Sequence, residues 1–253
     1  MIDVQNIRKR FGDQEILKGI STTFEQGKCN LIIGSSGAGK TVFLKCLVGL
    51  FEPEEGDILY DGRKLKSLNV REKKDLRKEM GMLFQGNALF DSLTVEENVR
   101  FPLDMFTKQT MEEKMERVNF CLDRVNLKNA NKKYPGEISG GMMKRVGIAR
   151  AIVMNPKYLF CDEPNSGLDP QTALLIDELI MELTQEFNMT TVINTHDMNS
   201  VMGIGDKVSF FHQGHIHWEG TKDDILTTKN QLLSDFIFAS DFLKKLREAA
   251  LNK

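Results

Sequence analysis

A glycine-rich loop between an apolar run and a helical pattern limits this chain to a few folds. The apolar run at 29–33 (CNLII) is typical of a strand buried on both faces, and a helical pattern runs from Lys40 to Leu50, closing at Gly49. Between them the chain fits G-x-x-x-x-G-K-[ST] at Gly34, Ser35, Ser36, Gly37, Ala38, Gly39, Lys40 and Thr41. Glycines let backbone N–H groups point at phosphate oxygens, and the helix N-terminus adds partial positive charge. The pattern predicts a nucleotide phosphate site.

Two side chains of this loop have separate chemical tasks in such a site. Lys40 is expected to reach the β- and γ-phosphates, and the Thr41 hydroxyl to ligate Mg²⁺. A glycine turn that fits the motif by chance is the alternative, but its place after a strand and before a helix argues against it. Kinases, GTPases and many ATPases share the motif, so it does not choose among them.

A second strand ends in two acidic residues. The run 157–163 (KYLFCDE) is apolar until Asp162 and Glu163. Asp162 is expected to hold Mg²⁺ through its outer shell, and Glu163 to polarise an attacking water. A strand that ends in a solvated acidic turn is the alternative interpretation, and the glycine-rich loop upstream favours the catalytic one.

The rest of the chain alternates short apolar strands with helices. Strands are predicted at 2–7, 16–24, 56–62, 80–85, 158–161, 190–194 and 208–211, and helices around 115–125, up to about 154, and over 174–183. The predicted class is α/β, with a mostly parallel sheet and helices on its faces. The run from about 87 to 154 is interpreted as a helical insertion, and 235–253 as a short amphipathic helix capped by Ser240.

Five further elements, in order, resemble the ATP-binding cassette (ABC) ATPases. Ile138-Ser139-Gly140-Gly141-Met142 is similar to the family's LSGGQ signature. Gln85 resembles the Q-loop glutamine, and 166–169 (SGLD) resembles the D-loop with Asp169. His196 resembles the switch histidine, and Phe11 stands in the place of the aromatic residue that stacks on adenine. The resemblance covers about residues 2–220.

The resemblance implies a fold and a division of labour. It implies a P-loop NTPase core with an N-terminal antiparallel β subdomain and an inserted helical subdomain, as one domain over 1–253: core 1–86 and 155–220, helical subdomain 87–154, C-terminal extension 221–253.

The signature residues Ser139, Gly140 and Gly141 would contact the γ-phosphate held by a second copy's loop, so two chains would close head-to-tail around two ATP molecules. Gln85 would help order Mg²⁺ and water, His196 would hold the γ-phosphate, and Asp169 would couple the two sites. The implied catalytic set is Glu163, His196 and Gln85, and the implied metal set is Thr41, Gln85 and Asp162.

Departures from the family pattern are mild. Ile138 replaces leucine, Met142 replaces glutamine, and Asn165 stands where threonine or alanine is usual. None removes a group that the chemistry needs, so active hydrolysis is favoured over a regulatory cassette that only binds ATP.

Three longer stretches resemble the ATPases of Mla/MCE-type lipid transporters. They are FQGNALFDSL (84–93), SGGMMKRV (139–146) and EPNSGLDP (163–170). This resemblance implies phospholipid movement between bacterial membranes, with integral permease subunits and an MCE-type lipid-binding protein as partners. Segment 84–99 lies where the family docks the permease, and Thr94 with Glu97 also predicts a capping box. The tail residues Phe236, Phe238, Phe242 and Leu246 would contact a partner cassette, or pack on their own domain. Importers of amino acids or other small solutes remain the alternative.

Composition restricts the partners and the place of work. The 253 residues carry 34 Lys+Arg and 36 Asp+Glu, a net charge of −2, which argues against a nucleic-acid partner. A soluble ABC protein acting on ribosomes or DNA is the alternative of another class. Such proteins usually carry two fused cassettes, a long coiled-coil insertion or a basic face, and the sequence shows none of these. No run approaches the roughly 18–20 apolar residues that span a bilayer, and the N-terminus does not resemble a secretory signal. The cysteines are far apart and are expected to be reduced, mostly buried thiols: Cys29, Cys46, Cys121 and Cys161. We expect a peripheral protein on the cytoplasmic face of the bacterial inner membrane.

Overall fold

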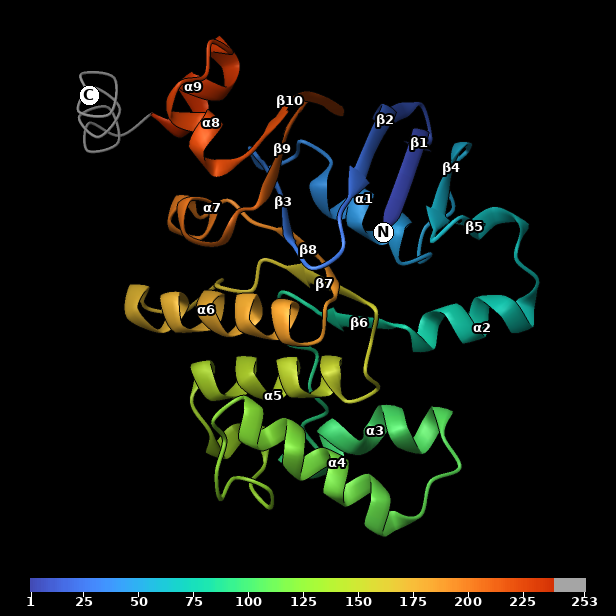
Figure 1. The fold of residues 1–253 in the computed structure, drawn as a ribbon, viewed down its shortest axis with the longest axis vertical. Helices are drawn as coiled ribbons and strands as arrows, with labels where there is room; N and C mark the ends of the chain where they lie inside the picture. The colour runs from blue at the N-terminus through green and yellow to red at the C-terminus, as the bar shows by residue number, and fades with distance from the viewer. Residues whose placement is uncertain (239–253) are drawn as a thin grey trace.

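Two β-sheets with helices around them make up the computed structural model, which describes residues 1–238 (Figure 1). The strands are β1 (Ile2–Phe11), β2 (Gln14–Phe24), β3 (Cys29–Gly34), β4 (Glu55–Tyr60), β5 (Arg63–Lys64), β6 (Met80–Leu83), β7 (Tyr158–Asp162), β8 (Thr190–Asn194), β9 (Lys207–His212) and β10 (His215–Gly220). The helices are α1 (Lys40–Leu47), α2 (Val70–Lys78), α3 (Val95–Phe106), α4 (Met111–Arg124), α5 (Gly140–Ile152), α6 (Pro170–Glu186), α7 (Met198–Ile204), α8 (Lys222–Leu226) and α9 (Gln231–Ile237), with short 3-10 turns η1 (Leu65–Ser67) and η2 (Pro135–Glu137).

The larger sheet is mostly parallel. Its order is β10-β9-β3-β8-β7-β6, and only β10 runs antiparallel to its neighbour. The smaller sheet, β2-β1-β4-β5, is antiparallel throughout. This arrangement confirms the predicted α/β class, with a P-loop core, an antiparallel N-terminal sheet and a helical subdomain.

The larger sheet is buried on both faces. In β3, Leu31 and Ile33 join an apolar cluster with helices α3 to α7, whereas Ile32 points the other way into a cluster with α1 and the smaller sheet. Because successive side chains of a strand point to opposite faces, an unbroken apolar run such as β3 is stable only between two covering layers. The core therefore holds the strand ends of the larger sheet in a rigid frame.

Helices α3, α4 and α5 form a group at the end of the molecule remote from the smaller sheet (Figure 1). Thr94 and Glu97 make the predicted capping box at the start of α3, with reciprocal hydrogen bonds between side chain and backbone. Helix α5 packs on α3 and α4 and also against β6. It thus connects the helical group to the edge of the larger sheet.

Several element ends differ from the predicted ones. Helix α1 ends at Leu47, before Gly49 turns the chain with φ +72°, rather than at Leu50. Strand β6 ends at Leu83, so Gln85 lies in a loop. Helix α5 begins at Gly140, so the signature glycines form its first turn. In the tail, Phe236 of α9 packs against the chain's own apolar cluster, and Phe238, directly after α9, is buried in it. The remaining predicted tail residues, Ser240, Phe242 and Leu246, lie outside the described residues.

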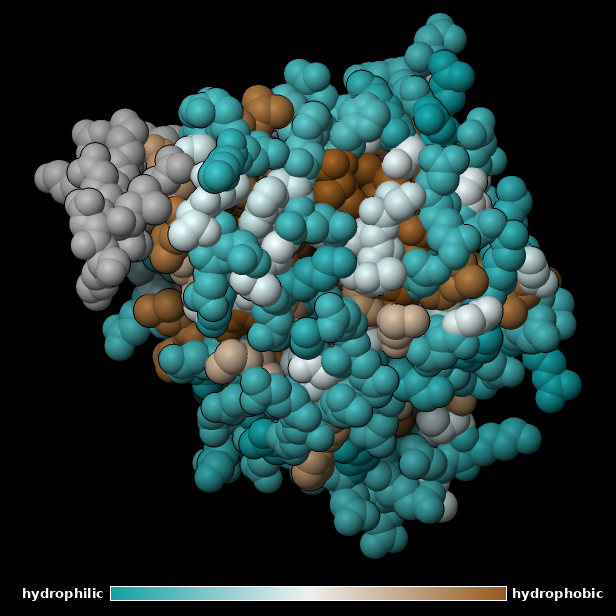
Figure 2. Space-filling model, turned by 45° about the horizontal axis from the view of Figure 1, so that its top comes forward, coloured by the Kyte–Doolittle hydropathy of each residue, from teal (hydrophilic) through white to brown (hydrophobic). Residues whose placement is uncertain are grey.

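The face of the molecule in Figure 2 is largely hydrophilic, with apolar side chains grouped between hydrophilic ones. The described residues include no helix that is both long and apolar enough to cross a membrane. All four cysteines are buried and free, as predicted.

Candidate functional site

The carboxyl ends of four neighbouring strands carry most of the predicted site residues. In the order β3, β8, β7, β6, these ends lead into the glycine-rich loop, Asn194, Asp162 and the Gln85 loop. Asp162 and Asn194 are direct partners in the β7–β8 register. In open α/β sheets, ligands bind at this edge, because loops from several strands converge there.

A cleft of about 800 Å³ opens along this edge. Its lining contains the whole glycine-rich loop together with side chains from five other segments: Gln14, Ile16, residues 34–42, Gln85, Glu163, His196, Met198 and Phe236. The fold thus brings Gln85, Glu163 and His196 to the loop that is predicted to bind phosphate, although they are far apart in the sequence.

Two glycines of the loop are required by its geometry. Gly34 has φ +146°, and a Cβ there would lie 2.2 Å from the Phe211 carbonyl oxygen. Gly39 has φ +101°, a left-handed conformation at the N-cap of α1. Lys40 is buried under the loop, where its Nζ donates to the Gly34 and Ser35 carbonyl oxygens at 2.7 and 3.1 Å. Burial lowers the pKa of Lys40, and phosphate oxygens would compensate this desolvation better than carbonyls do.

Three oxygen-bearing side chains form a compact cluster beside the loop. The Thr41 hydroxyl lies 3.4 Å from Asp162 Oδ1, and Asn194 Nδ2 donates to both of these groups. Asn194 Oδ1 is buried and has no hydrogen-bond partner among the described residues. Hydroxyl, carboxylate and amide oxygens are the donor set that Mg²⁺ prefers, so the residues present fit this ion. Sequence reasoning missed Asn194; a polar residue ending a buried strand was the available signal.

Glu163 and His196 form a pair that faces the cleft. His196 Nδ1 lies 2.8 Å from Glu163 Oε2, and the Glu163 side chain is 13% exposed against 69% for His196. Glu163 has φ +51°, unusual for a residue with a Cβ, and its backbone N–H donates to the Asn194 carbonyl at 2.8 Å. The strand pairing therefore holds the carboxylate at the cleft in a conformation that a free loop would avoid.

The predicted signature and D-loop residues meet in a different cleft. It is lined by Ser139, Gly140, Gly141, Met142, Arg145, Gly167, Leu168, Asp169 and Thr172. Ser139 caps α5 and Asp169 caps α6, so both side chains already accept backbone N–H groups. A Cβ on Gly141 would meet Thr172 at 2.9 Å, which shows how closely the two helix starts approach. The chain thus carries its glycine-rich loop and its signature in two separate clefts.

Phe11 does not line either cleft. It is exposed, packs edge-on against Phe51 with ring centroids 5.3 Å apart, and has Lys9 Nζ 5.2 Å from its ring centroid. The predicted stacking of Phe11 on adenine therefore stays a prediction.

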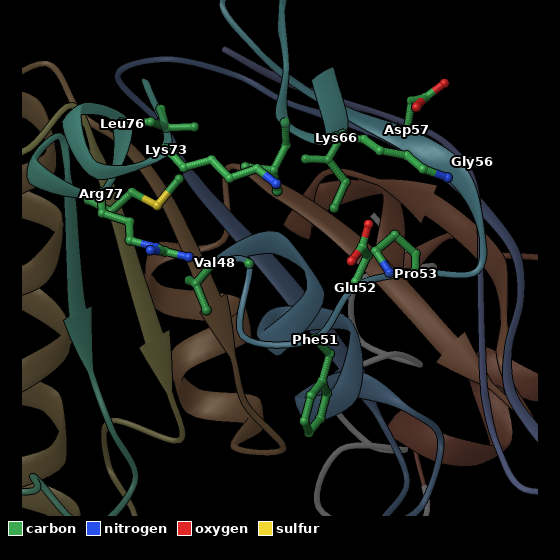
Figure 3. A pocket seen from close by; sticks show the side chains of 14 residues that line it. Val48, Phe51, Glu52, Pro53, Gly56, Asp57, Lys66, Lys73, Leu76 and Arg77 are labelled. Atoms are coloured by element: carbon green, nitrogen blue, oxygen red, sulfur yellow. The ribbon is translucent and has the colours of Figure 1, made fainter. Parts of the chain in front are cut away.

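A smaller pocket of about 90 Å³ lies between α1, β4 and α2, away from these clefts (Figure 3). Lys73 and Arg77 of α2 line one side of the pocket, and Val48 and Phe51, which follow α1, also line it (Figure 3). None of the predicted site residues lines this pocket.

Comparisons with known proteins agree with this geometry. The sequence profile of the family described as "ABC transporter" matches residues 17–166. The chain is 37% identical over 236 residues to the "Probable ribonucleotide transport ATP-binding protein mkl" of Mycobacterium tuberculosis, covering 93% of this chain and 66% of that protein. This chain thus spans just under two thirds of that relative's length.

Two further proteins extend the likeness. The chain is 38% identical over 259 residues to the "Methionine import ATP-binding protein MetN" of Campylobacter jejuni, covering 96% of this chain and 77% of that one. The dimeric structure of MJ0796, described as a bacterial ABC transporter cassette, superposes with a TM-score of 0.80 at 31% identity over 88% of this chain and 99% of its own. On the profile match and these identities, this chain belongs to the ABC transporter family, as an ATP-binding subunit built on the ABC ATPase fold.

Proposed function

We propose that this chain hydrolyses ATP with Mg²⁺ and that Glu163 polarises the attacking water. The observation that carries the proposal is the Glu163–His196 pair, 2.8 Å apart, facing the cleft formed by the glycine-rich loop. Thr41, Asp162 and Gln85 would hold Mg²⁺, which would supply positive charge to the phosphates. A carboxylate oriented by a neighbouring imidazole is suited to accept a proton from water, so the pair acts as base and positioner. MJ0796, a structural neighbour, has been solved in a post-hydrolysis state bound to ADP and Pi.

Replacing one carboxylate tests this assignment. Glu163→Gln keeps the size of the side chain but removes the base, so turnover should fall at least about 100-fold while ATP affinity stays within a few-fold. Phosphate release and binding of a fluorescent ATP analogue measure the two quantities. Glu178→Gln, the same change at an exposed position on α6, is the matched control and should turn over ATP like the parent chain. Unchanged turnover in Glu163→Gln would exclude Glu163 as the base.

We infer that two copies of the chain close head-to-tail. The glycine-rich loop and the signature lie in separate clefts, so one chain alone does not surround a γ-phosphate from both sides. A two-fold arrangement supplies each loop with the partner's Ser139, Gly140 and Gly141, and it places each Asp169 at the interface between the sites.

An apolar groove next to the Gln85 loop is the proposed docking surface for a permease. Four partly exposed phenylalanines line it: Phe84, Phe90, Phe101 and Phe106. Phe90 and Phe101 pack with centroids 4.8 Å apart, and Arg77, Lys78 and Arg150 stand at the same groove. A short cytoplasmic helix of a permease, with an apolar face and an acidic residue, complements this combination of apolar and basic side chains.

The proposed cargo is phospholipid, moved between bacterial membranes with the help of an MCE-type lipid-binding protein. Support comes from the similarity of segments 84–93, 139–146 and 163–170 to the Mla/MCE-type ATPases. Import of small solutes is the second candidate, and the relatives named for methionine import and ribonucleotide transport favour it. With either cargo, the proposed location is the cytoplasmic face of the inner membrane. The proposed subdomains are the core (1–86 and 155–220), the helical subdomain (87–154) and the C-terminal extension (221–253).

Purification from membranes separates these possibilities. The tagged chain should copurify with integral membrane subunits, and mass spectrometry should find either phospholipid with an MCE-type protein or a solute-binding protein. Phe90→Glu should abolish this association while the purified chain keeps its own ATP turnover. Salt-sensitive recovery with RNA or DNA, without membrane proteins, would instead support a non-transport ABC protein.

A further inference from the structure

Helix α5 holds the backbone of the Gln85 loop with two cations. Lys144 Nζ donates to the Gln85 carbonyl oxygen at 2.7 Å. Arg150 donates through Nη1 to the Ala88 carbonyl at 2.7 Å and through Nη2 to the Asn87 carbonyl. Three of the four carbonyl groups between 85 and 88 are therefore held by one helix. Hydrogen bonds from charged donors are about twice as strong as neutral ones, so this is a firm attachment.

The loop that is held this way has an unfavourable backbone conformation. Asn87 and Ala88 are consecutive and both left-handed, with φ +60° and +49°. Residues with a Cβ are strained in this conformation, and alanine has no polar side chain to compensate. The Asn87 side-chain oxygen is also buried without a hydrogen-bond partner among the described residues. Such a loop keeps its shape only if neighbouring groups hold it.

The side of α5 that contacts the Gln85 loop combines two cations with a glycine. Lys144, Gly147 and Arg150 are spaced three apart and lie along one side of the helix. A Cβ on Gly147 would lie 2.8 Å from Leu83 Cδ1 and 3.8 Å from Asn87 Cβ, so the missing side chain lets the loop lie close to the helix. Lys144 is only 2% exposed. Burial lowers the pKa of Lys144, while nearby Cys161, Glu163 and Asp162 act in the opposite direction.

We propose that Lys144 and Arg150 are positioning residues that hold the Gln85 loop on the helix carrying the signature, so that Gln85 and Ser139 move as one unit. Gln85 lines the nucleotide cleft, and Ala88 and Arg150 line the apolar groove. A displacement at the groove is therefore transmitted through two charged hydrogen-bonded contacts to the Gln85 side chain. The inference rests on the proposed function, because it assigns Gln85 a role in turnover.

A double-mutant cycle tests whether Lys144 acts through Gln85. Lys144→Met keeps the apolar stem and removes the donor, so kcat should fall roughly tenfold and the Mg²⁺ concentration for half-maximal rate should rise, with ATP affinity unchanged. In a Gln85→Ala background, the same Lys144→Met change should cost less than about twofold, because its route to the site is already lost. An equal loss in both backgrounds would overturn the proposal, since it would reflect a general structural effect.

Two further variants keep the test decisive. Lys114→Met removes a lysine of α4 that is paired with Asp104 and should leave kcat and the Mg²⁺ requirement unchanged. If Lys144→Met does not fold, Arg150→Met and Arg150→Lys replace it; the Arg150→Lys variant retains the charge but reaches one carbonyl at most, so it should restore only part of the rate. Full activity of Lys144→Met or Arg150→Met, alongside an inactive Glu163→Gln, would reject the positioning role of these cations but leave the proposed function standing. An active Glu163→Gln would instead reject the proposed function.

Discussion

At the scale of single residues, a buried polar network adjoins the segment that carries the Glu163–His196 pair. Asn165 follows Glu163 by two positions, and its amide nitrogen donates to Asp177 Oδ1 on α6 and to Ser200 Oγ on α7, both at 2.9 Å. All three residues are buried. The network therefore connects the segment after Glu163 to the helix that follows His196. The presence of asparagine where the family uses threonine or alanine is explained by its two donor hydrogens, which serve two acceptors at once.

Asp177 makes stability depend on pH. Burial raises its pKa to about 6, and hydrogen bonds from Ser200 and Asn165 offset this only in part. Because the folded pKa lies above the unfolded one, the folded state binds more protons between about pH 4 and 6, and the free energy of unfolding falls as pH rises through that window. Asp177→Asn removes the ionisation, so above about pH 7 it should raise the free energy of unfolding by about 1–3 kcal/mol relative to the parent.

Urea unfolding at about pH 4.5 and about pH 8 measures this difference. The gain of Asp177→Asn should be large at the higher pH and less than about half as large at the lower one, where the parent's aspartate is protonated when folded but still mostly ionised when unfolded. Asp123→Asn, at an exposed position on α4, serves as the control. A difference of the same size at both pH values would show that the charge of Asp177 is not its cause.

At the scale of elements, the contact between β6 and α5 is unusually close. A Cβ on Gly81 would lie 2.3 Å from the Ala151 carbonyl oxygen. This oxygen is a backbone atom of α5, so it cannot move aside unless the helix moves. Strand and helix therefore touch through backbone, which leaves little freedom between the edge of the sheet and the helix carrying the signature. This close packing is consistent with the cations of α5 reaching the loop that follows β6.

Gly81→Ala should disturb this contact. It should lower the free energy of unfolding by roughly 1–3 kcal/mol, because the strand or the helix must shift. Gly203→Ala on α7, where a Cβ meets nothing within 4 Å, is the matched control and should be neutral or slightly stabilising. Urea midpoints compare the two variants. Equal stability of Gly81→Ala and the parent would mean that β6 and α5 can move apart at little cost, contrary to the close contact described above.

At the scale of the whole molecule, two separate clefts imply an assembly that completes them. Each chain offers one glycine-rich loop and one signature cleft. Gly140 at the signature has a helical backbone, and a Cβ added there would meet no atom within 4 Å. A glutamate at this position should therefore fold and place a carboxylate near the partner's phosphate, where the two negative charges repel.

Complementation tests the head-to-tail arrangement. Lys40→Ala and Gly140→Glu should each be inactive alone, but their heterodimer has one site built from two intact halves. An equal mixture should recover up to about a quarter of the parent rate, since half of the dimers are mixed and each has one working site. Phosphate release from the mixture, against each variant alone at the same total concentration, measures the recovery. A mixture as inactive as its components would contradict two shared sites.

Local sequence patterns were sufficient for much of the fold. The apolar run of β3, the Thr94–Glu97 capping box and the strand at 190–194 depend on neighbours within a few residues, and all three are found as predicted. Element ends were less predictable: whether α1 continues past Leu47 depends on Gly49, whose left-handed turn is decided by packing as well as by propensity.

By itself, the sequence determined the glycine-rich loop and the two acids at the end of β7, because their spacing along the chain encodes the local backbone geometry that phosphate and Mg²⁺ need. Only the tertiary structure decided which other groups join them. Asn194 stands beside Asp162 because β8 lies next to β7, and Lys144 reaches the Gln85 loop because α5 packs directly on β6. These partners are tens of residues apart, and no local pattern specifies a strand order or a helix contact; the burial of apolar faces does.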